Sequence, residues 1–151
     1  MAENPVQQLI NEQRALEERI DELQNSIGMF QDTLASYRTG LGVLEELETK
    51  EVGDKILFSI GGAVYIEAQI LNKESIIRSL GSGVRVEQSL EEAKTILSER
   101  IEQLNTSLST LRQEYEGAVN RAAWISNQMQ SIYAQAQAQA AQMAQPPKSE
   151  E

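Results

Sequence analysis

The sequence has 151 residues, of which 40% are hydrophobic and only 5% aromatic, too few large apolar side chains for a typical compact globular core. Its 23 acidic and 13 basic residues give a net charge of −10 at pH 7, which argues against binding to nucleic acid or to an anionic membrane surface. The absence of Cys and His excludes disulfides, Cys or His catalysis and the usual zinc, copper and haem ligand sets. No apolar run is long enough to span a bilayer. We therefore expect a cytoplasmic protein that is not an enzyme, holds no metal or other cofactor, and binds neither nucleic acid nor membranes.

Charge divides the chain into three parts. Residues 1–51 have a net charge of −7, residues 52–87 are neutral, and residues 88–151 have a net charge of −3. The neutral part also collects β-branched residues and glycines, which are typical of strands and turns. The pattern predicts one α+β subunit that is mainly α, with an N-terminal coiled-coil helix over 4–49, two β-hairpins over 54–87, a C-terminal coiled-coil helix over 89–143 and a disordered tail over 144–151.

The N-terminal helix carries an unbroken heptad pattern, here called the first seam. Steps of three and four residues reach twelve positions: Val6, Leu9, Gln13, Leu16, Ile20, Leu23, Ile27, Phe30, Leu34, Tyr37, Leu41 and Leu44. Eleven are apolar or aromatic, and the single polar one, Gln13, is the kind of residue that fixes coiled-coil register. Gly40 and Gly42 lie off the seam, and each costs roughly 1 kcal/mol relative to Ala in a helix. We expect irregular last turns or the close approach of a neighbour there.

The C-terminal helix carries a second seam, which begins after a capping box formed by Ser89 and Glu92. Its positions are Leu90, Lys94, Leu97, Ile101, Leu104, Leu108, Leu111, Tyr115, Ala118, Ala122, Ile125, Met129, Ile132, Ala136, Gln139 and Met143. Side chains become smaller along this seam, so packing should weaken toward the C-terminus. Trp124 lies off the seam, and it is either a contact for a partner or client or an ordinary surface residue.

The middle part changes from a helical period to an alternation of two. Two alternating runs surround Gly61-Gly62, and two shorter ones surround Gly81-Ser82-Gly83, which predicts two β-hairpins. Isolated hairpins are marginal in water and present unpaired strand edges, so we expect them to pair with strands of other chains. The expected assembly residues are Ile56, Phe58, Ile60, Val64, Ile66, Ile70, Ile77, Leu80, Val84 and Val86. The two seams should pair as a long antiparallel coiled-coil hairpin with the β-hairpins at its base.

Two stretches of the middle part carry a family resemblance. Phe58-Ser-Ile-Gly-Gly-Ala-Val-Tyr-Ile-Glu-Ala68 and Ile76-Ile-Arg-Ser-Leu-Gly-Ser-Gly-Val-Arg-Val-Glu-Gln-Ser-Leu-Glu-Glu-Ala93 resemble the core of the prefoldin family. The heptads on either side extend the resemblance over nearly the whole chain. Two hairpins instead of one resemble the alpha class in its archaeal form.

The resemblance implies an ATP-independent molecular chaperone, or holdase, built as a hexamer of two alpha and four beta subunits. The hairpins would contribute to an oligomeric β-barrel, and the coiled coils would hold non-native client proteins at their tips for delivery to a group II chaperonin. The sequence contains no G-x-x-x-x-G-K-[ST] nucleotide-binding motif, as this function requires none.

The tips can be located from the expected pairing. If Leu44 packs near Lys94, then antiparallel pairing places Val6 opposite Ile132 and leaves the seam after Tyr133 without a partner helix. Exposed apolar side chains at such an end would suit clients that have no fixed shape, and flexible Met side chains suit them best. The expected client-binding residues are Val6, Leu9, Ile10, Met129, Ile132, Tyr133 and Met143.

One other function stays open. A structural coiled-coil adaptor or scaffold subunit without chaperone activity would show the same heptads. The β insert distinguishes the two functions, because a simple adaptor has no reason to carry two hairpins.

Overall fold

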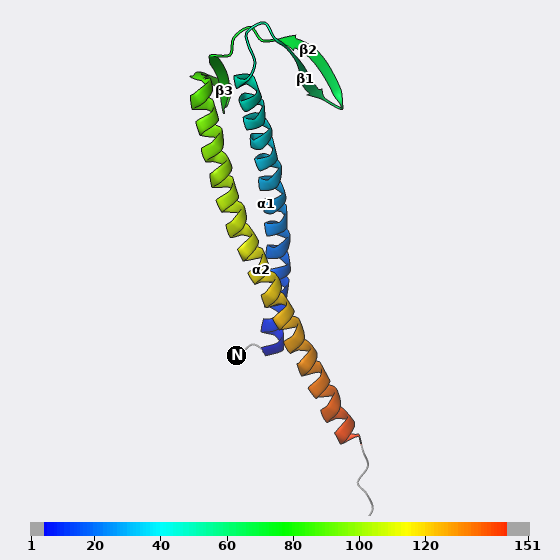
Figure 1. The fold of residues 1–151 in the computed structure, drawn as a ribbon. Coiled ribbons are helices and arrows are strands. Elements are labelled where there is room, and N and C mark those ends of the chain that lie inside the picture. Colours follow the sequence, from blue (N-terminus) through cyan, green and yellow to red (C-terminus); the bar gives the residue numbers. More distant parts are fainter. Residues whose placement is uncertain (1–4, 145–151) are drawn as a thin grey trace, which may run out of the picture. The chain divides into compact units, whose positions relative to one another are not determined.

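The computed structural model describes residues 5–144. Its elements, in chain order, are α1 (Pro5–Glu48), β1 (Lys55–Gly61), β2 (Val64–Gln69), β3 (Ser75–Gly81), β4 (Val84–Ser89) and α2 (Leu90–Met143) (Figure 1). Two long helices with two small antiparallel hairpins between them confirm the predicted fold class. The tail was predicted over 144–151; Ala144 is described and donates a hydrogen bond to the Ala140 carbonyl oxygen at 3.1 Å, whereas the rest of the tail and the helix start predicted at residue 4 lie outside the described residues. Neither helix, over this described range, contains a stretch apolar enough to cross a bilayer.

The chain divides into two units, and each helix contributes to both. The helical unit consists of Met1–Gly28 and Ser109–Glu151, and the hairpin unit consists of Met29–Leu108. The helical unit therefore contains the start of α1 and most of α2, whereas the hairpin unit contains all four strands with the adjoining helix ends.

The helical unit has a buried seam. Leu23 and Ile125 are 2% and 0% exposed, and the other first-seam positions of this unit are half-buried. Gln13 Nε2 donates a hydrogen bond to Glu17 Oε1 at 3.1 Å, but Gln13 Oε1 is buried without a hydrogen-bond partner among residues 5–144. An unpaired buried oxygen costs stability, and a polar seam residue that fixes register carries this kind of cost.

Two ion pairs show the direction of the helices in this unit. Arg19 Nη2 lies 2.8 Å from Glu114 Oε2, and Arg121 Nε lies 2.7 Å from Glu12 Oε1. One heptad toward the N-terminus on α1, from Arg19 to Glu12, corresponds to one heptad toward the C-terminus on α2, from Glu114 to Arg121. The helices of this unit are therefore antiparallel.

In the hairpin unit, the end of α1 and the start of α2 lie side by side (Figure 1). Leu34, Ala93 and Leu108 are at most 6% exposed, and Arg38 Nη2 donates to Asn105 Oδ1 at 3.3 Å. The buried side chains come from both seams and from the first turn of α2, so this part of the unit is held by helix packing.

Close helix approach explains one of the two off-seam glycines of α1. A β-carbon added to Gly40 would lie only 3.2 Å from Leu97 Cδ2, whereas one added to Gly42 would meet nothing within 4 Å. Gly40 therefore lies where α2 comes close to α1, which is one of the two outcomes expected from the sequence.

The start of α2 is capped as the sequence predicted. Ser89 Oγ accepts a hydrogen bond from the Glu92 backbone N–H at 3.1 Å, and Glu92 Oε2 accepts one from the Ser89 N–H at 3.0 Å. These reciprocal bonds satisfy backbone donors that have no partner inside the helix.

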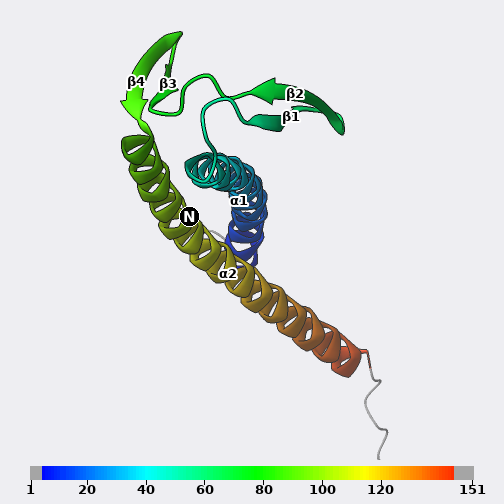
Figure 2. The same ribbon diagram turned by 45° about the horizontal axis from the view of Figure 1, so that its top comes forward.

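The strands form two separate two-stranded antiparallel sheets, β1–β2 and β3–β4 (Figure 2). The first hairpin pairs from Lys55↔Gln69 to Gly61↔Val64, and the second pairs from Ser75↔Ser89 to Gly81↔Val84. Both loops consist of two residues with positive φ, as in the type I′ turns that favour hairpins. Each loop is preceded by a glycine, Gly61 with a φ of +98° and Gly81 with a φ of +96°, which L-residues rarely adopt.

Candidate functional site

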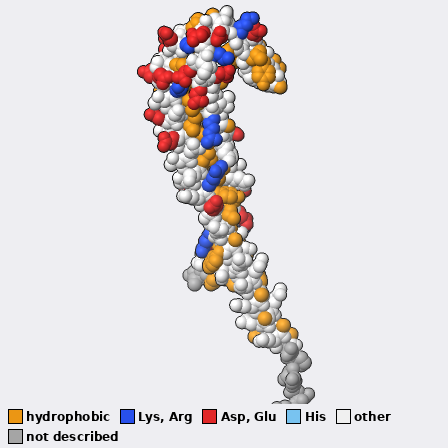
Figure 3. Space-filling model, in the orientation of Figure 1, with side chains coloured by type: hydrophobic (Ala, Val, Ile, Leu, Met, Phe, Trp, Pro, Cys, Tyr) orange, Lys and Arg blue, Asp and Glu red, His pale blue; other side chains and the backbone are white. Residues whose placement is uncertain are grey.

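The β1–β2 hairpin exposes apolar side chains on both of its faces. Phe58 and Ile66 are directly opposite each other across the two strands and are 53% and 48% exposed. Figure 3 shows hydrophobic surface gathered on this hairpin. The exposed apolar residues are Leu57, Phe58, Ile60, Val64, Tyr65 and Ile66. Such a surface on a two-stranded sheet, which also has open edges, is typical of an interaction site.

The other expected assembly residues fall into three groups. On the β3–β4 hairpin, Ile77, Leu80 and Val84 are exposed, like the apolar residues of the first hairpin. Ile56 and Val86 are half-buried. Ile70 is only 5% exposed, so its side chain is not available at the surface.

Ile70 corrects the sequence prediction. Its N–H donates to the Asp54 carbonyl oxygen at 3.0 Å, and its carbonyl oxygen accepts a hydrogen bond from the Gly53 N–H at 2.8 Å. These bonds extend the β1–β2 pairing beyond the strand ends and hold Ile70 in the interior of the hairpin unit. Alternation assigns Ile70 to the same face as Val64 and Ile66, but exposure falls along this face toward the start of the hairpin, from 48% at Ile66 to 5% at Ile70.

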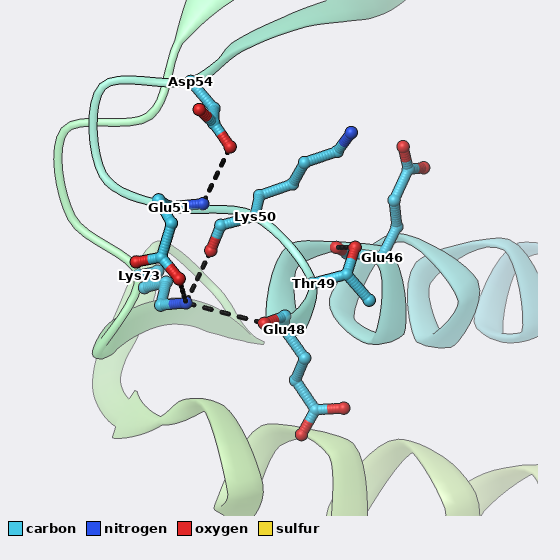
Figure 4. A network of polar contacts seen from close by, with 7 residues as sticks. All are labelled: Glu46, Glu48, Thr49, Lys50, Glu51, Asp54 and Lys73. Atoms are coloured by element: carbon cyan, nitrogen blue, oxygen red, sulfur yellow. Dashed lines mark hydrogen bonds and ion pairs between the residues drawn. The ribbon is translucent and has the colours of Figure 1, made fainter.

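The C-terminus of α1 is held by a lysine from outside the helix. The last turns of α1 contain Glu45, Glu46 and Glu48 and no basic residue, an unfavourable arrangement at the negative end of the helix dipole. Lys73, from the connection between the hairpins, donates to the carbonyl oxygen of Lys50 at 2.5 Å and lies 3.5 Å from that of Glu48 (Figure 4). Lys73 therefore supplies both the hydrogen-bond donor and the positive charge that this helix end lacks.

A second lysine neutralises the same end. Lys94 Nζ lies 2.7 Å from Glu48 Oε1 and 3.6 Å from Glu91 Oε1. The hydrogen bond from Lys94 lowers the pKa of the Glu48 carboxyl below its ordinary value, and the same bond raises the pKa of Lys94. Lys94 is the one basic residue of the second seam, and this contact explains why a charge is tolerated there.

In the helical unit, the burial of the α2 seam ends at Ile132. Ala136, Gln139 and Met143 are exposed, and Met143 is 90% exposed. Of the expected client-binding residues, Tyr133 and Met143 are exposed, whereas Val6, Leu9, Ile10, Met129 and Ile132 are half-buried. The exposed end of α2 therefore carries Tyr133 and Met143 on an Ala/Gln-rich stretch, and the other expected client-binding residues are partly covered.

A contact that the sequence analysis missed lies in the same unit. The guanidinium carbon of Arg121 is 4.3 Å from the centre of the Trp124 ring, while Arg121 Nε is bonded to Glu12 on α1. This hydrogen bond lowers the pKa of Glu12 and raises that of Arg121. Residues three apart on a helix are neighbours, so the spacing of Arg121 and Trp124 could have predicted their contact from the sequence.

Comparison with known proteins agrees with this architecture. The family model described as "Prefoldin subunit" matches residues 16–135. Prefoldin subunit alpha from Thermofilum pendens is 31% identical over 99 residues, which cover 66% of this chain and 77% of that protein. Prefoldin subunit alpha from Archaeoglobus fulgidus is 24% identical over 128 residues, which cover 85% of this chain and 93% of that protein.

Two solved structures share the fold. A chain of filamentous PFD from Methanocaldococcus jannaschii has a TM-score of 0.58 and 24% identity, covering 83% of this chain and 98% of its own length. The prefoldin beta subunit from Thermococcus strain KS-1 has a TM-score of 0.56 and 16% identity, covering 85% of this chain and 93% of its own. The family match spans most of the chain and the curated relatives are alpha subunits, so the chain belongs to the prefoldin family, in its alpha class.

Proposed function

We propose that this chain is a subunit of an ATP-independent holdase, which binds non-native proteins at the free end of its helices and delivers them to a group II chaperonin. Membership of the prefoldin family implies a chaperone function in cooperation with a chaperonin and a complex with beta-class subunits. The holding mechanism, the client site and the assembly of two alpha with four beta subunits are the further parts of the proposal.

The exposed apolar side chains of the hairpins are the main support for the proposed assembly with other subunits. Phe58 and Ile66 are 53% and 48% exposed on a sheet that, among residues 5–144, has no third strand. Burial of apolar area contributes roughly 25 cal/mol per Å², so a surface of this kind favours pairing with other chains. Strands of neighbouring subunits that complete these sheets into a barrel would cover both the faces and the edges.

The exposed side chains at the end of α2 are the evidence for the proposed client-binding site. Tyr133 and Met143 are exposed beyond the last buried seam position of the helical unit. Methionine is flexible and polarisable, so it adapts to apolar segments of varying shape. Weak contacts at several subunit ends would then add through multivalency, without a tight pocket on any one subunit.

The negative charge of the chain indicates that docking to the chaperonin has an electrostatic component. Residues 1–51 and 88–151 carry net charges of −7 and −3, so docking of an arm to the chaperonin would include charged contacts. Contacts at an exposed rim weaken as salt is raised past about 0.15 M, where the Debye length is about 8 Å. Equal chaperonin affinity at low and high salt would contradict this part of the proposal.

Truncation tests the holdase directly. Removing residues 1–10 together with 133–151 should leave assembly with beta-class subunits intact but abolish most protection of a denatured protein from aggregation without ATP. A finer comparison replaces Tyr133 and Met143 with Ser, and uses Met29→Ser as the control because Met29 is 70% exposed elsewhere on α1. Full protection by the truncated assembly would place the client site elsewhere.

A further inference from the structure

A cavity of about 390 Å³ lies in the hairpin unit among α1, the β3–β4 hairpin and α2. Two arginines line it, Arg78 from β3 and Arg100 from α2, together with the hydroxyl-bearing side chains of Ser36, Tyr37 and Ser79. The remaining walls are aliphatic and include Leu80. The cavity therefore combines strong hydrogen-bond donors with apolar walls.

Neither arginine forms an ion pair with a carboxylate among residues 5–144. Arg78 Nε donates to Gln88 Oε1 at 2.9 Å, and Arg100 Nη1 donates to Gln103 Oε1 at 3.0 Å, so both partners are neutral amides. No carboxylate lines the cavity. Two positive charges that share a cavity without an anion repel each other, and an anionic group between them would relieve this repulsion.

An internal repeat shows that Arg78 is a departure from an apolar pattern. Every pairing of β3–β4 lies 20 residues after the corresponding pairing of β1–β2, and the two turns have matching positive φ values. Five positions are identical at this spacing: Ile56 and Ile76, Ser59 and Ser79, Gly61 and Gly81, Val64 and Val84, and Glu67 and Glu87. At the same spacing Arg78 replaces Phe58, so the second hairpin carries a charge where the first carries an apolar ring.

We propose that this cavity receives the carboxylate of an acidic side chain from a neighbouring subunit in the assembly. A cavity of about 390 Å³ is far larger than one oxyanion, and its aliphatic walls suit the stem of a Glu or Asp side chain. Its wall residue Leu80 is 53% exposed on the same hairpin that carries the expected assembly residues. Planar guanidinium groups are the donors best matched to carboxylates. The inference rests on the assembly described under the proposed function.

The test measures association with beta-class subunits at low salt. Arg78→Gln and Arg100→Gln should each weaken association at least about tenfold, because the partner's carboxylate would be left buried without its cation. Arg78→Lys keeps the charge and should lose less. Arg112→Gln removes the same charge from α2 outside the cavity and should have little effect, and circular dichroism checks that every variant is folded.

Three results would overturn the inference, and they are distinguishable. If the wild-type chain does not assemble with beta-class subunits, the proposed function is wrong, and so is the assignment of a partner's carboxylate to this cavity. If the wild type assembles and both Gln variants match Arg112→Gln, only the cavity assignment fails. If inorganic phosphate, compared with chloride at equal ionic strength, raises the melting temperature of the wild-type chain alone but not of Arg78→Gln, and assembly is unaffected, the ligand is a free anion.

Discussion

The guanidinium of Arg121 lies over the ring of Trp124, 4.3 Å from its centre, on the surface of α2. The same guanidinium is bonded to Glu12 of α1, so one side chain covers an aromatic ring and joins the two helices of the helical unit. A cation over an aromatic face is favourable, and this contact accounts for a Trp that remains 47% exposed on a coiled coil. Trp124 is therefore part of a cross-helix contact, besides any role it has toward partners.

Glu12→Gln should disturb this contact. The neutral amide holds Arg121 less strongly, so the cation moves relative to the ring and the melting temperature falls slightly. Trp124 is the single Trp of the sequence, so its fluorescence reports on this site alone. Glu18→Gln is the control, because Glu18 is exposed on the same part of α1. Identical native emission from both variants would show that Glu12 does not position Arg121.

The off-seam glycines of α1 should differ in their response to alanine. Gly42→Ala should raise the free energy of unfolding by about 1 kcal/mol, because Ala is the better helix former and its β-carbon meets no atom within 4 Å. Gly40→Ala should gain less or lose stability, because its β-carbon would press against Leu97 at 3.2 Å. Denaturant unfolding of the two variants measures the difference, and equal gains would mean that Leu97 moves aside freely.

Both seams were predictable because the period of a coiled coil is written directly into its sequence. All twelve first-seam positions are buried or half-buried, including Gln13. The two hairpins were predictable from alternation around glycines for the same reason. The 20-residue repeat was also present in the sequence and could have been found by comparing residues 55–69 with residues 75–89.

Contacts between distant residues were not predictable in this way. Arg121 and Glu12 are 109 residues apart, and their pairing depends on which heptads face each other. Lys73 is a single lysine in a short connection, and no local pattern shows that it reaches the carbonyl oxygens at the end of α1. Ile70 is buried whereas Ile66 is 48% exposed, a difference along the strand that alternation alone does not predict.

The pair formed by Glu48 and Lys94 should make stability depend on pH. The folded-state pKa of Glu48 lies below its ordinary value, so its stabilisation is complete above that ordinary value and is lost as the pH falls through the folded pKa. The pKa of Lys94 is raised, so its contribution is complete below its ordinary value and is lost as the pH rises through the folded pKa. The difference in melting temperature between the wild type and Glu48→Gln should therefore be largest near neutral pH and shrink as the pH falls below the ordinary pKa of a Glu carboxyl.

Glu45→Gln is the matched control for this measurement. It removes a carboxylate from the same acidic end of α1, where the helix dipole disfavours negative charge, but it leaves the Lys94 contact in place. It should not lower the melting temperature at neutral pH. A difference between wild type and Glu48→Gln that stays constant down to acid pH would contradict the role given to the ion pair.

Phe58→Asp or Ile66→Asp should block assembly with beta-class subunits while leaving the helix content of the chain largely intact. Each change puts a charge into the apolar face of β1–β2, where burial by a partner would leave the charge unpaired. Leu71→Asp is the control, since Leu71 is 82% exposed but lies between the hairpins. Size-exclusion chromatography with light scattering gives the result, and an intact hexamer from either strand variant would contradict the assembly surface.

The two-helix architecture also sets the order in which the chain can fold during its own synthesis. The seam of α1 is complete once Glu48 has been made, but the buried and half-buried part of the α2 seam extends to Ile132, which is 84 residues later. At roughly 5–20 residues per second, translation of that interval takes about 4–17 s. Lys73 and Lys94, which neutralise the acidic end of α1, also arrive within it. For those seconds the growing chain presents an apolar stripe of its own to solvent, so a newborn copy resembles the unfolded polypeptides that chaperones bind.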